Sequence, residues 1–159
     1  MRFEIWWGCD ALGFLYVSRK GVEKNLIKAA QLYTKACELK EGVGCKRLWS
    51  LYYYGRGVEK NLIKAAQYAS KACDLNNGSG CGVLGFLYGS GKGVKQDLKK
   101  AVALYEKSCD LKDGSGCFNL GISYGYGRGI EKNLTKADQY ISKACKLGDQ
   151  ETCEVLKEK

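Results

Sequence analysis

Nine cysteines are the side chains of this 159-residue sequence that could do chemistry. Eight of them fall into pairs separated by eight positions, and each pair encloses a short polar stretch such as DLNNGSG at residues 74–80. Two thiols at this spacing could form a disulfide, stay reduced as small buried hydrophobic residues, or contribute to a metal site. The spacing does not match a C-x-x-C zinc knuckle, and each pair would supply only two ligands. Disulfides are therefore favoured, with reduced buried thiols as the alternative.

The sequence contains no histidine, which closes several routes to catalysis. Neither a Ser-His-Asp or Cys-His nucleophile nor a His-ligated zinc can be built without it. We therefore assign no catalytic residue and expect no cofactor and no metal. The formal net charge of +9 permits an acidic partner such as nucleic acid, an anionic membrane or an acidic protein, but says nothing of the fold.

A 36-residue repeat organises the chain and places the cysteines. Residues 84–117 align with residues 48–81 at a shift of 36, and the cysteines form one series starting at Cys9 and another starting at Cys37. A unit of this length is a supersecondary element that must stack on its neighbours to bury its apolar face. The predicted repeats are about 9–44, 45–80, 81–116 and 117–152.

Each repeat has the pattern of two helices. Cys45, Leu48, Trp49 and Tyr52 have the spacing of one helical face within residues 45–54. The GRGVEKN stretch at 55–61 then breaks the helix, and Asn61 is the expected N-cap of a second helix. The matching cap positions hold Asn25, Asp97 and Asn133, and the second helix is expected to end where Gly78 supplies a left-handed residue.

This pattern predicts an all-α protein, an α-solenoid of stacked antiparallel hairpins in one domain over residues 1–159. The hairpins are expected near 9–40, 45–76, 81–112 and 117–148, followed by a short polar capping helix at 150–158. No apolar run approaches the roughly 18 residues of a membrane span, and the first ten residues make a poor signal peptide. We therefore expect a chain without a membrane span or its own export signal.

The predicted helices determine where the two cysteines of each pair lie relative to each other. Cys73 lies one turn before the end of one helix and Cys81 one turn into the next, so they stand at similar heights on antiparallel neighbours. Their Cα atoms can then reach the ~4.4–6.8 Å of a disulfide, and this usage indicates an oxidising compartment. Cys9 has no partner by the period, so we expect a free thiol in a piece or variant start of a longer array, with a disulfide between two chains as the alternative. The predicted disulfides are Cys37–Cys45, Cys73–Cys81, Cys109–Cys117 and Cys145–Cys153.

The stretch LGFLYGSGKGVKQDLKKAVALYEKSCDLKDGSGC at 84–117 resembles the Sel-like repeat, a relative of the tetratricopeptide repeat. With its period and paired cysteines, the chain resembles the Helicobacter cysteine-rich protein family. The resemblance implies a secreted or periplasmic right-handed superhelix of disulfide-linked hairpins. Two departures stand out: Arg19 replaces a loop glycine, and Trp49 replaces the glycine found at 13, 85 and 121, so the second hairpin must adjust its packing.

The same resemblance implies two functions. Family members are labelled putative β-lactamases or penicillin-binding proteins and are also thought to interact with host cells. A serine β-lactamase needs S-x-x-K, S-D-N and K-T-G, and no serine here has lysine three positions later. We therefore favour a scaffold that binds a peptide or protein, such as a host protein, and keep weak β-lactam hydrolysis or binding of a peptidoglycan-like molecule as the alternative.

The groove of an α-solenoid is lined in this class by the first helix of each repeat. Positions opposite the core face vary between repeats while core positions stay constant, which predicts a concave surface that binds an extended peptide. The alternative is that these positions are ordinary solvent-exposed residues with no binding role. The predicted binding residues are Arg47, Ser50, Tyr54, Phe86, Asn119 and Tyr126, with Ala11, Phe14, Ser18, Val83, Ser90 and Ile122 at equivalent groove positions.

Lysines recur seven positions apart on the second helix of each repeat, as in Lys64 and Lys71. A solvated convex face is the favoured interpretation, with an anionic surface left open. Nucleic-acid binding is not expected, because aromatic residues are not interleaved with these lysines in the sequence and no recognised module accompanies them. We expect a monomer.

Overall fold

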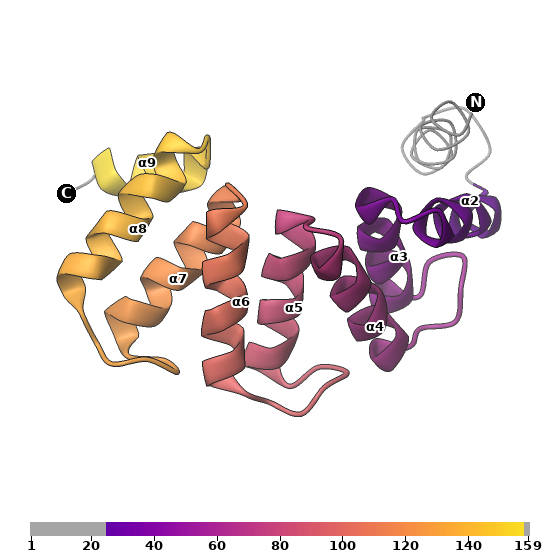
Figure 1. The fold of residues 1–159 in the computed structure, drawn as a ribbon, viewed down its shortest axis with the longest axis horizontal. Coiled ribbons are helices and arrows are strands. Elements are labelled where there is room, and N and C mark those ends of the chain that lie inside the picture. The colour runs from indigo at the N-terminus through magenta and orange to yellow at the C-terminus, as the bar shows by residue number, and fades with distance from the viewer. Residues whose placement is uncertain (1–24, 158–159) are drawn as a thin grey trace.

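The computed structural model describes residues 25–157, which form a curved row of helices with α2 at one end and α9 at the other (Figure 1). No strand occurs among these residues. The expected first helix of the first repeat, the predicted free thiol of Cys9 and the groove positions Ala11, Phe14 and Ser18 lie outside them. The helices are α2 (Leu26–Glu38), α3 (Gly42–Tyr54), α4 (Leu62–Asp74), α5 (Gly78–Ser90), α6 (Leu98–Asp110), α7 (Gly114–Tyr126), α8 (Leu134–Lys146) and α9 (Gln150–Lys157).

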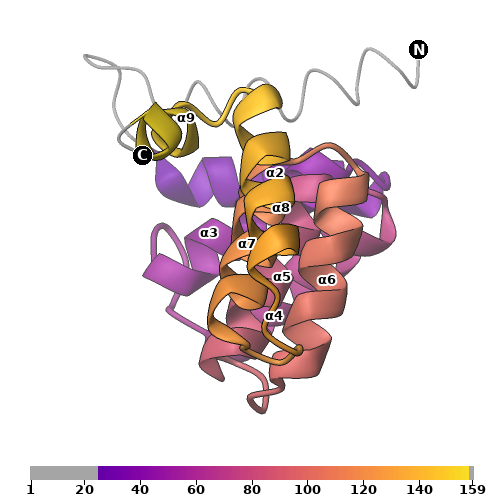
Figure 2. The ribbon, with the colours of Figure 1, turned by 90° about the vertical axis from the view of Figure 1, so that its left-hand side faces the viewer.

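The helices form antiparallel hairpins, α3 with α4, α5 with α6 and α7 with α8, stacked one behind the other (Figure 2). We call α3, α5 and α7 the A helices and α2, α4, α6 and α8 the B helices. Consecutive A helices contact one another, whereas no consecutive pair of B helices makes comparable contact. In a curved stack the elements on the inner side approach each other most closely, so the A helices form the inner side. The predicted α-solenoid is confirmed.

Each B helix begins at a polar side chain that caps it. The side-chain oxygens of Asn25, Asn61, Asp97 and Asn133 accept hydrogen bonds from the backbone N–H three residues later, at 2.9–3.0 Å. Such bonds satisfy one of the free N–H groups of the first turn. The loop between α3 and α4 turns through Gly55 and Gly57, at φ 67° and 69°, where a residue with a side chain would be strained. The expected caps are therefore confirmed.

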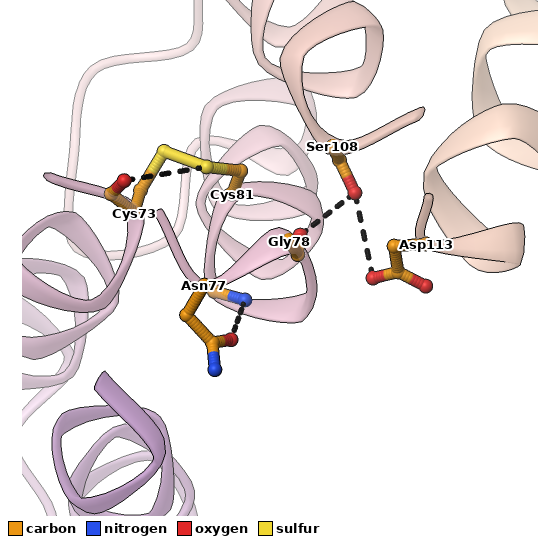
Figure 3. Close-up of a disulfide and its surroundings, with 7 residues drawn as sticks. Cys73, Asn77, Gly78, Cys81, Ser108 and Asp113 are labelled. Carbon is orange, nitrogen blue, oxygen red and sulfur yellow. Dashed lines mark hydrogen bonds between the residues drawn. A yellow bond between two sulfur atoms is a disulfide. The ribbon is translucent and has the colours of Figure 1, made fainter. Parts of the chain in front are cut away.

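The end of the B helix differs from the expectation. The left-handed residue after α4 is Asn76 at φ 58°, and Gly78 is instead the first residue of α5. Asn77 caps α5 by accepting from the N–H of Gly80 at 2.7 Å (Figure 3). Glycine at position 78 avoids a tight contact, because a Cβ there would lie 3.1 Å from the Cβ of Leu111. The A helices consequently start three residues before the cysteine.

Glycine and alanine allow the B helix to approach the following A helix at the Cys37–Cys45 and Cys73–Cys81 pairs. A Cβ at Gly80 would lie 2.6 Å from the Cβ of Ala72, and both residues are buried. The Cα atoms of Cys73 and Cys81 are 4.4 Å apart, and those of all four pairs are 4.4–4.8 Å apart and bridged by disulfides. The bridges therefore link each B helix to the next helix, as the predicted disulfide-linked fold requires. The bridged pairs are Cys37–Cys45, Cys73–Cys81, Cys109–Cys117 and Cys145–Cys153.

The indole of Trp49 is accommodated by a small residue on the partner helix. Trp49 packs against the buried cluster that contains Ala66 and Ala69. The third hairpin carries Tyr105 where the second carries Ala69, and glycine where the second carries Trp49. The expected adjustment is thus an exchange of large and small side chains between the two helices.

Candidate functional site

The six residues predicted to bind a ligand all lie on A helices. Arg47, Ser50 and Tyr54 belong to α3, Phe86 to α5, and Asn119 and Tyr126 to α7. Tyr54, Phe86 and Tyr126 are 58%, 42% and 75% exposed, and the other three are half-buried. All six therefore lie on the elements that form the inner side of the stack.

Two of these residues meet in a pocket between α5 and α7. The pocket has a volume of about 240 Å³ and brings Phe86 from α5 together with Asn119 from α7. Leu98 and Ala101 of α6, with Ile122 of α7, add apolar surface. A concave site that combines apolar surface with a few polar groups is a common form of a small binding site. The remaining lining residues are Gly89, Ser90, Tyr105, Ser123 and Arg128.

Three side chains supply polar groups to this pocket. Tyr105 of α6 carries a phenol whose pKa is raised by burial, although the positive charge of Arg128 opposes that shift. Arg128 comes from the loop between α7 and α8 and is exposed. The amide of Asn119 can both donate and accept hydrogen bonds. The pocket therefore combines apolar surface with hydrogen-bond donors and one positive charge.

The two serines of the pocket are already hydrogen-bonded to their own helices. Ser90 Oγ donates to the carbonyl of Phe86 at 2.8 Å, and Ser123 Oγ donates to the carbonyl of Asn119 at 2.9 Å. The buried Ser108 donates to the carbonyl of Gly78 at 2.7 Å (Figure 3). None of these three serine hydroxyls is hydrogen-bonded to a lysine side chain.

Next to the pocket, an aromatic cluster covers the junction of α3 and α5. The ring centroids of Trp49 and Tyr53 are 5.5 Å apart, and those of Tyr53 and Tyr54 are 4.9 Å apart. Lys92, in the loop after α5, donates to the Tyr53 hydroxyl at 2.9 Å and lies 5.5 Å from the ring of Phe86. The indole Nε1 of Trp49 is buried without a hydrogen-bond partner. Lys92 thus connects two consecutive hairpins on their inner side.

Other predicted residues lie apart from the pocket. Arg47 is positioned over the ring of the buried Tyr33, at 5.7 Å, and so faces the preceding hairpin. Tyr54 belongs to the aromatic cluster, while Ser50 and Tyr126 line neither the pocket nor that cluster. Tyr105 and Arg128 were not among the residues predicted from the sequence. A signal for Arg128 was present, since Arg56, Lys92 and Arg128 recur at the 36-residue period.

The lysines of the B helices do have aromatic neighbours, contrary to expectation. Lys100 Nζ is 4.4 Å from the centroid of the Tyr88 ring, and Lys64 Nζ is 5.4 Å from that of Tyr52. Each pair joins the two helices of one hairpin, so residues distant in sequence meet in the fold. These contacts stabilise the hairpin through the attraction of a cation to an aromatic face. Within residues 25–157 there is no cluster of three or more side chains that could hold a metal ion.

Stacked helical hairpins with a pocket on their inner side define a solenoid-type repeat protein, a class whose extended inner surface serves recognition. The family comparison is more specific. The Sel1 repeat model matches residues 8–41, 43–77, 80–113 and 114–149, so the chain belongs to the Sel1 repeat family. Sel1 repeats are protein-interaction modules. Among the described helices, none combines the length and apolar character needed to cross a bilayer.

Solved structures support this assignment. Helicobacter pylori cysteine rich protein B is 46% identical over 84% of this chain and 96% of its own, with a TM-score of 0.68. A Sel1 repeat protein from Oxalobacter formigenes is 27% identical over 91% of this chain, and c5321, a protective antigen of uropathogenic Escherichia coli, shares the fold at 24% identity over 92%; both have a TM-score of 0.83. This chain spans 59% and 32% of those two proteins. No curated protein sequence matched significantly.

Proposed function

We propose that this protein binds an extended peptide, or an extended segment of a partner protein, along its A helices. The observation that carries the proposal is the pocket between α5 and α7, whose apolar residues could contact one side chain while Asn119 and Arg128 hydrogen-bond the backbone of the peptide or its neighbouring side chains. The exposed rings of Tyr54 and Phe86 extend the contact surface toward α3. Aromatic side chains are common anchors at such interfaces.

A pocket-filling variant tests this proposal. Gly89 lines the pocket, and a Cβ there would meet Tyr105 and Ala101 only at 3.6–3.7 Å, so the fold has room for a larger side chain. Gly89→Leu should occupy the pocket. Gly125, the equivalent residue of α7, is the matched control, because a Cβ there meets only Ala137 at 3.7 Å and the residue does not line the pocket.

The assay uses a random decapeptide library displayed on phage and selected on the immobilised full chain. An enriched peptide, made synthetically with a fluorescent label, should bind the native chain and the Gly125→Leu variant alike and bind Gly89→Leu at least about 10-fold more weakly. Circular dichroism would verify that both variants fold. Enriched peptides that bind Gly89→Leu as well as the native chain, or a selection with no enrichment, would refute the proposal.

We also propose that the protein works outside the cytoplasm. The support is the set of four disulfides, because such bonds persist in oxidising compartments and are rare in the cytosol. Mass spectrometry of the chain isolated from its native cells, with free thiols alkylated before lysis, provides the test. A single adduct, on Cys9, is expected. Nine adducts would place the reduced chain in a reducing compartment and contradict this proposal.

A further inference from the structure

A row of cations follows the inner side of the stack. Arg56, Lys92 and Arg128 occupy the same position in three successive loops between A and B helices. Arg56 lies 5.5 Å from the ring of Tyr54, and Lys92 lies 5.5 Å from the ring of Phe86. Arg128 lines the pocket beside Phe86. These three cations therefore lie beside the aromatic side chains of the protein that are proposed to contact the ligand.

Carboxylates are excluded from the helices beside this row. No aspartate or glutamate occurs within the bounds of α3, α5 or α7. Glu41 and Asp113 lie one residue before α3 and α7, at the opposite ends of these helices from the row, and their oxygens accept from backbone N–H groups. Glu59 and Glu131 follow in the loops, yet neither pairs with the arginine three residues earlier. The loop after α5 has Lys95 at the equivalent position, and its one carboxylate, Asp97, accepts the backbone N–H of Lys100 as the cap of α6.

From this charge distribution we infer that the ligand is an acidic peptide. This inference rests on the proposed function. An apolar side chain of the peptide occupies the pocket between α5 and α7, and flanking aspartate or glutamate side chains contact Lys92 and Arg128. Arginine pairs well with carboxylates because its planar guanidinium donates two parallel hydrogen bonds. Because α3, α5 and α7 contain no aspartate or glutamate, no carboxylate of these helices would repel an acidic ligand.

General attraction to a protein of charge +9 must be separated from recognition by this row. The B helices provide the comparison, because Lys100 and Lys136 are exposed and lie over tyrosine rings of their own hairpins. The double variant Lys92→Gln/Arg128→Gln removes two charges beside the pocket. The matched control Lys100→Gln/Lys136→Gln removes two charges from the B helices and changes the net charge equally.

The experiment extends the selection from the random decapeptide library, which imposes no charge. We expect the enriched peptides to be rich in aspartate and glutamate around one apolar residue. Replacing those acids by asparagine and glutamine should weaken binding to the native chain at least about 10-fold, and so should Lys92→Gln/Arg128→Gln. The control double variant should bind within about 2-fold of the native chain. Thermal unfolding of both double variants verifies that they fold.

The possible failures are distinguishable. If neutral or basic peptides are enriched and are lost with Gly89→Leu, the proposed groove stands and the acidic-ligand inference is wrong. If acidic peptides are enriched but both double variants weaken binding equally, net charge alone explains the attraction and the inference is also wrong. If binding does not depend on Gly89 at all, the proposed function fails, and the inference fails with it.

Discussion

The ring of Tyr105 lies directly against the backbone of Gly85: a Cβ added to Gly85 would be 2.7 Å from Cε1 of the tyrosine. The fourth hairpin repeats the arrangement, since a Cβ at Gly121 would be 2.8 Å from Cγ1 of Ile141. In the second hairpin the sizes are reversed. There Trp49 takes the glycine position, and the fully buried Ala69 faces it. Each hairpin therefore holds one large side chain at this level, contributed by either helix.

This reciprocity predicts a compensating pair of substitutions. Ala69→Tyr alone should destabilise the protein by about 1–3 kcal/mol, because the ring and the indole compete for one space. Trp49→Gly alone should cost about 3–5 kcal/mol through the cavity it leaves. The double variant recreates the third hairpin and should be much more stable than the sum of the two costs. Urea unfolding followed by circular dichroism measures all four proteins of this cycle.

Additive costs, equal within about 0.5 kcal/mol to the sum of the single effects, would contradict this account. Glycine at position 49 would itself weaken the helix, so Trp49→Ala with Ala69 unchanged is the control, because alanine keeps a high helix propensity at that position. Its cost should still be large, since the cavity remains. The comparison therefore separates packing from backbone effects.

The bridge between Cys73 and Cys81 should contribute substantially to stability. It closes a loop of nine residues, for which the chain-entropy model gives about 2.5 kcal/mol. Cys73→Ala/Cys81→Ala should therefore lower the urea midpoint, and so should a reducing agent acting on the native chain. Both cysteines lie in the buried core, and replacing them with alanine introduces no polar group there.

The pair Cys145→Ala/Cys153→Ala is the matched comparison, because that bridge holds only the short terminal α9 onto α8. In a stack of repeats, terminal contacts influence their neighbours only. The global unfolding midpoint should therefore fall less than with the central pair. An equal or larger fall would show that α9 stabilises the whole stack.

The caps of the B helices permit a smaller test. Asn61→Ala removes the acceptor for the N–H of Lys64 and should cost about 1 kcal/mol. Asn61→Asp should preserve stability, because Asp97 makes the same bond in the third hairpin at 3.0 Å. Thermal unfolding compares the two variants. A loss with aspartate equal to that with alanine would mean that the cap acts through something other than its oxygen.

The features that recur with the 36-residue period could be predicted from the sequence. Asn61 and the pair Cys73–Cys81 were recognised because their equivalents recur every 36 residues beside clear helical patterns. Gly78 was misplaced because glycine favours both a left-handed turn and a close helix contact, and only the packing against Leu111 shows which applies. Boundaries of helices thus depended on contacts that the period does not reveal.

Only part of the pocket lining was predicted. Phe86 and Asn119 were identified from their variation along equivalent helix positions, whereas Tyr105 and Arg128 come from another helix and a loop. A repeat period shows which residues are equivalent, but it does not show which neighbouring elements converge. Tyr105 reaches the pocket because glycine at 85 leaves room for its ring, a relation visible only when the two helices are packed together.

The same tyrosine predicts how stability changes at high pH. Burial raises the pKa of Tyr105 above that of a tyrosine in the unfolded chain, which is about 10. Below that value both states hold the proton, and the contribution of the group is fully present. As the pH rises further, the unfolded chain loses its proton first, so the free energy of unfolding falls until the folded pKa is passed. Tyr68 and Tyr140 shift in the same direction through burial and nearby tyrosines and acids.

Tyr105→Phe should therefore reduce the loss of stability above about pH 10, and measurements near pH 8 give its packing effect alone. Arg128→Gln should act in the opposite sense, because the guanidinium charge lowers the pKa of Tyr105 and its removal lets that pKa rise further. Urea midpoints across this range, with the phenolate followed by ultraviolet absorbance, test both. Identical pH profiles for the native chain and Tyr105→Phe would show that the phenol is as well solvated in the folded protein as in the unfolded chain.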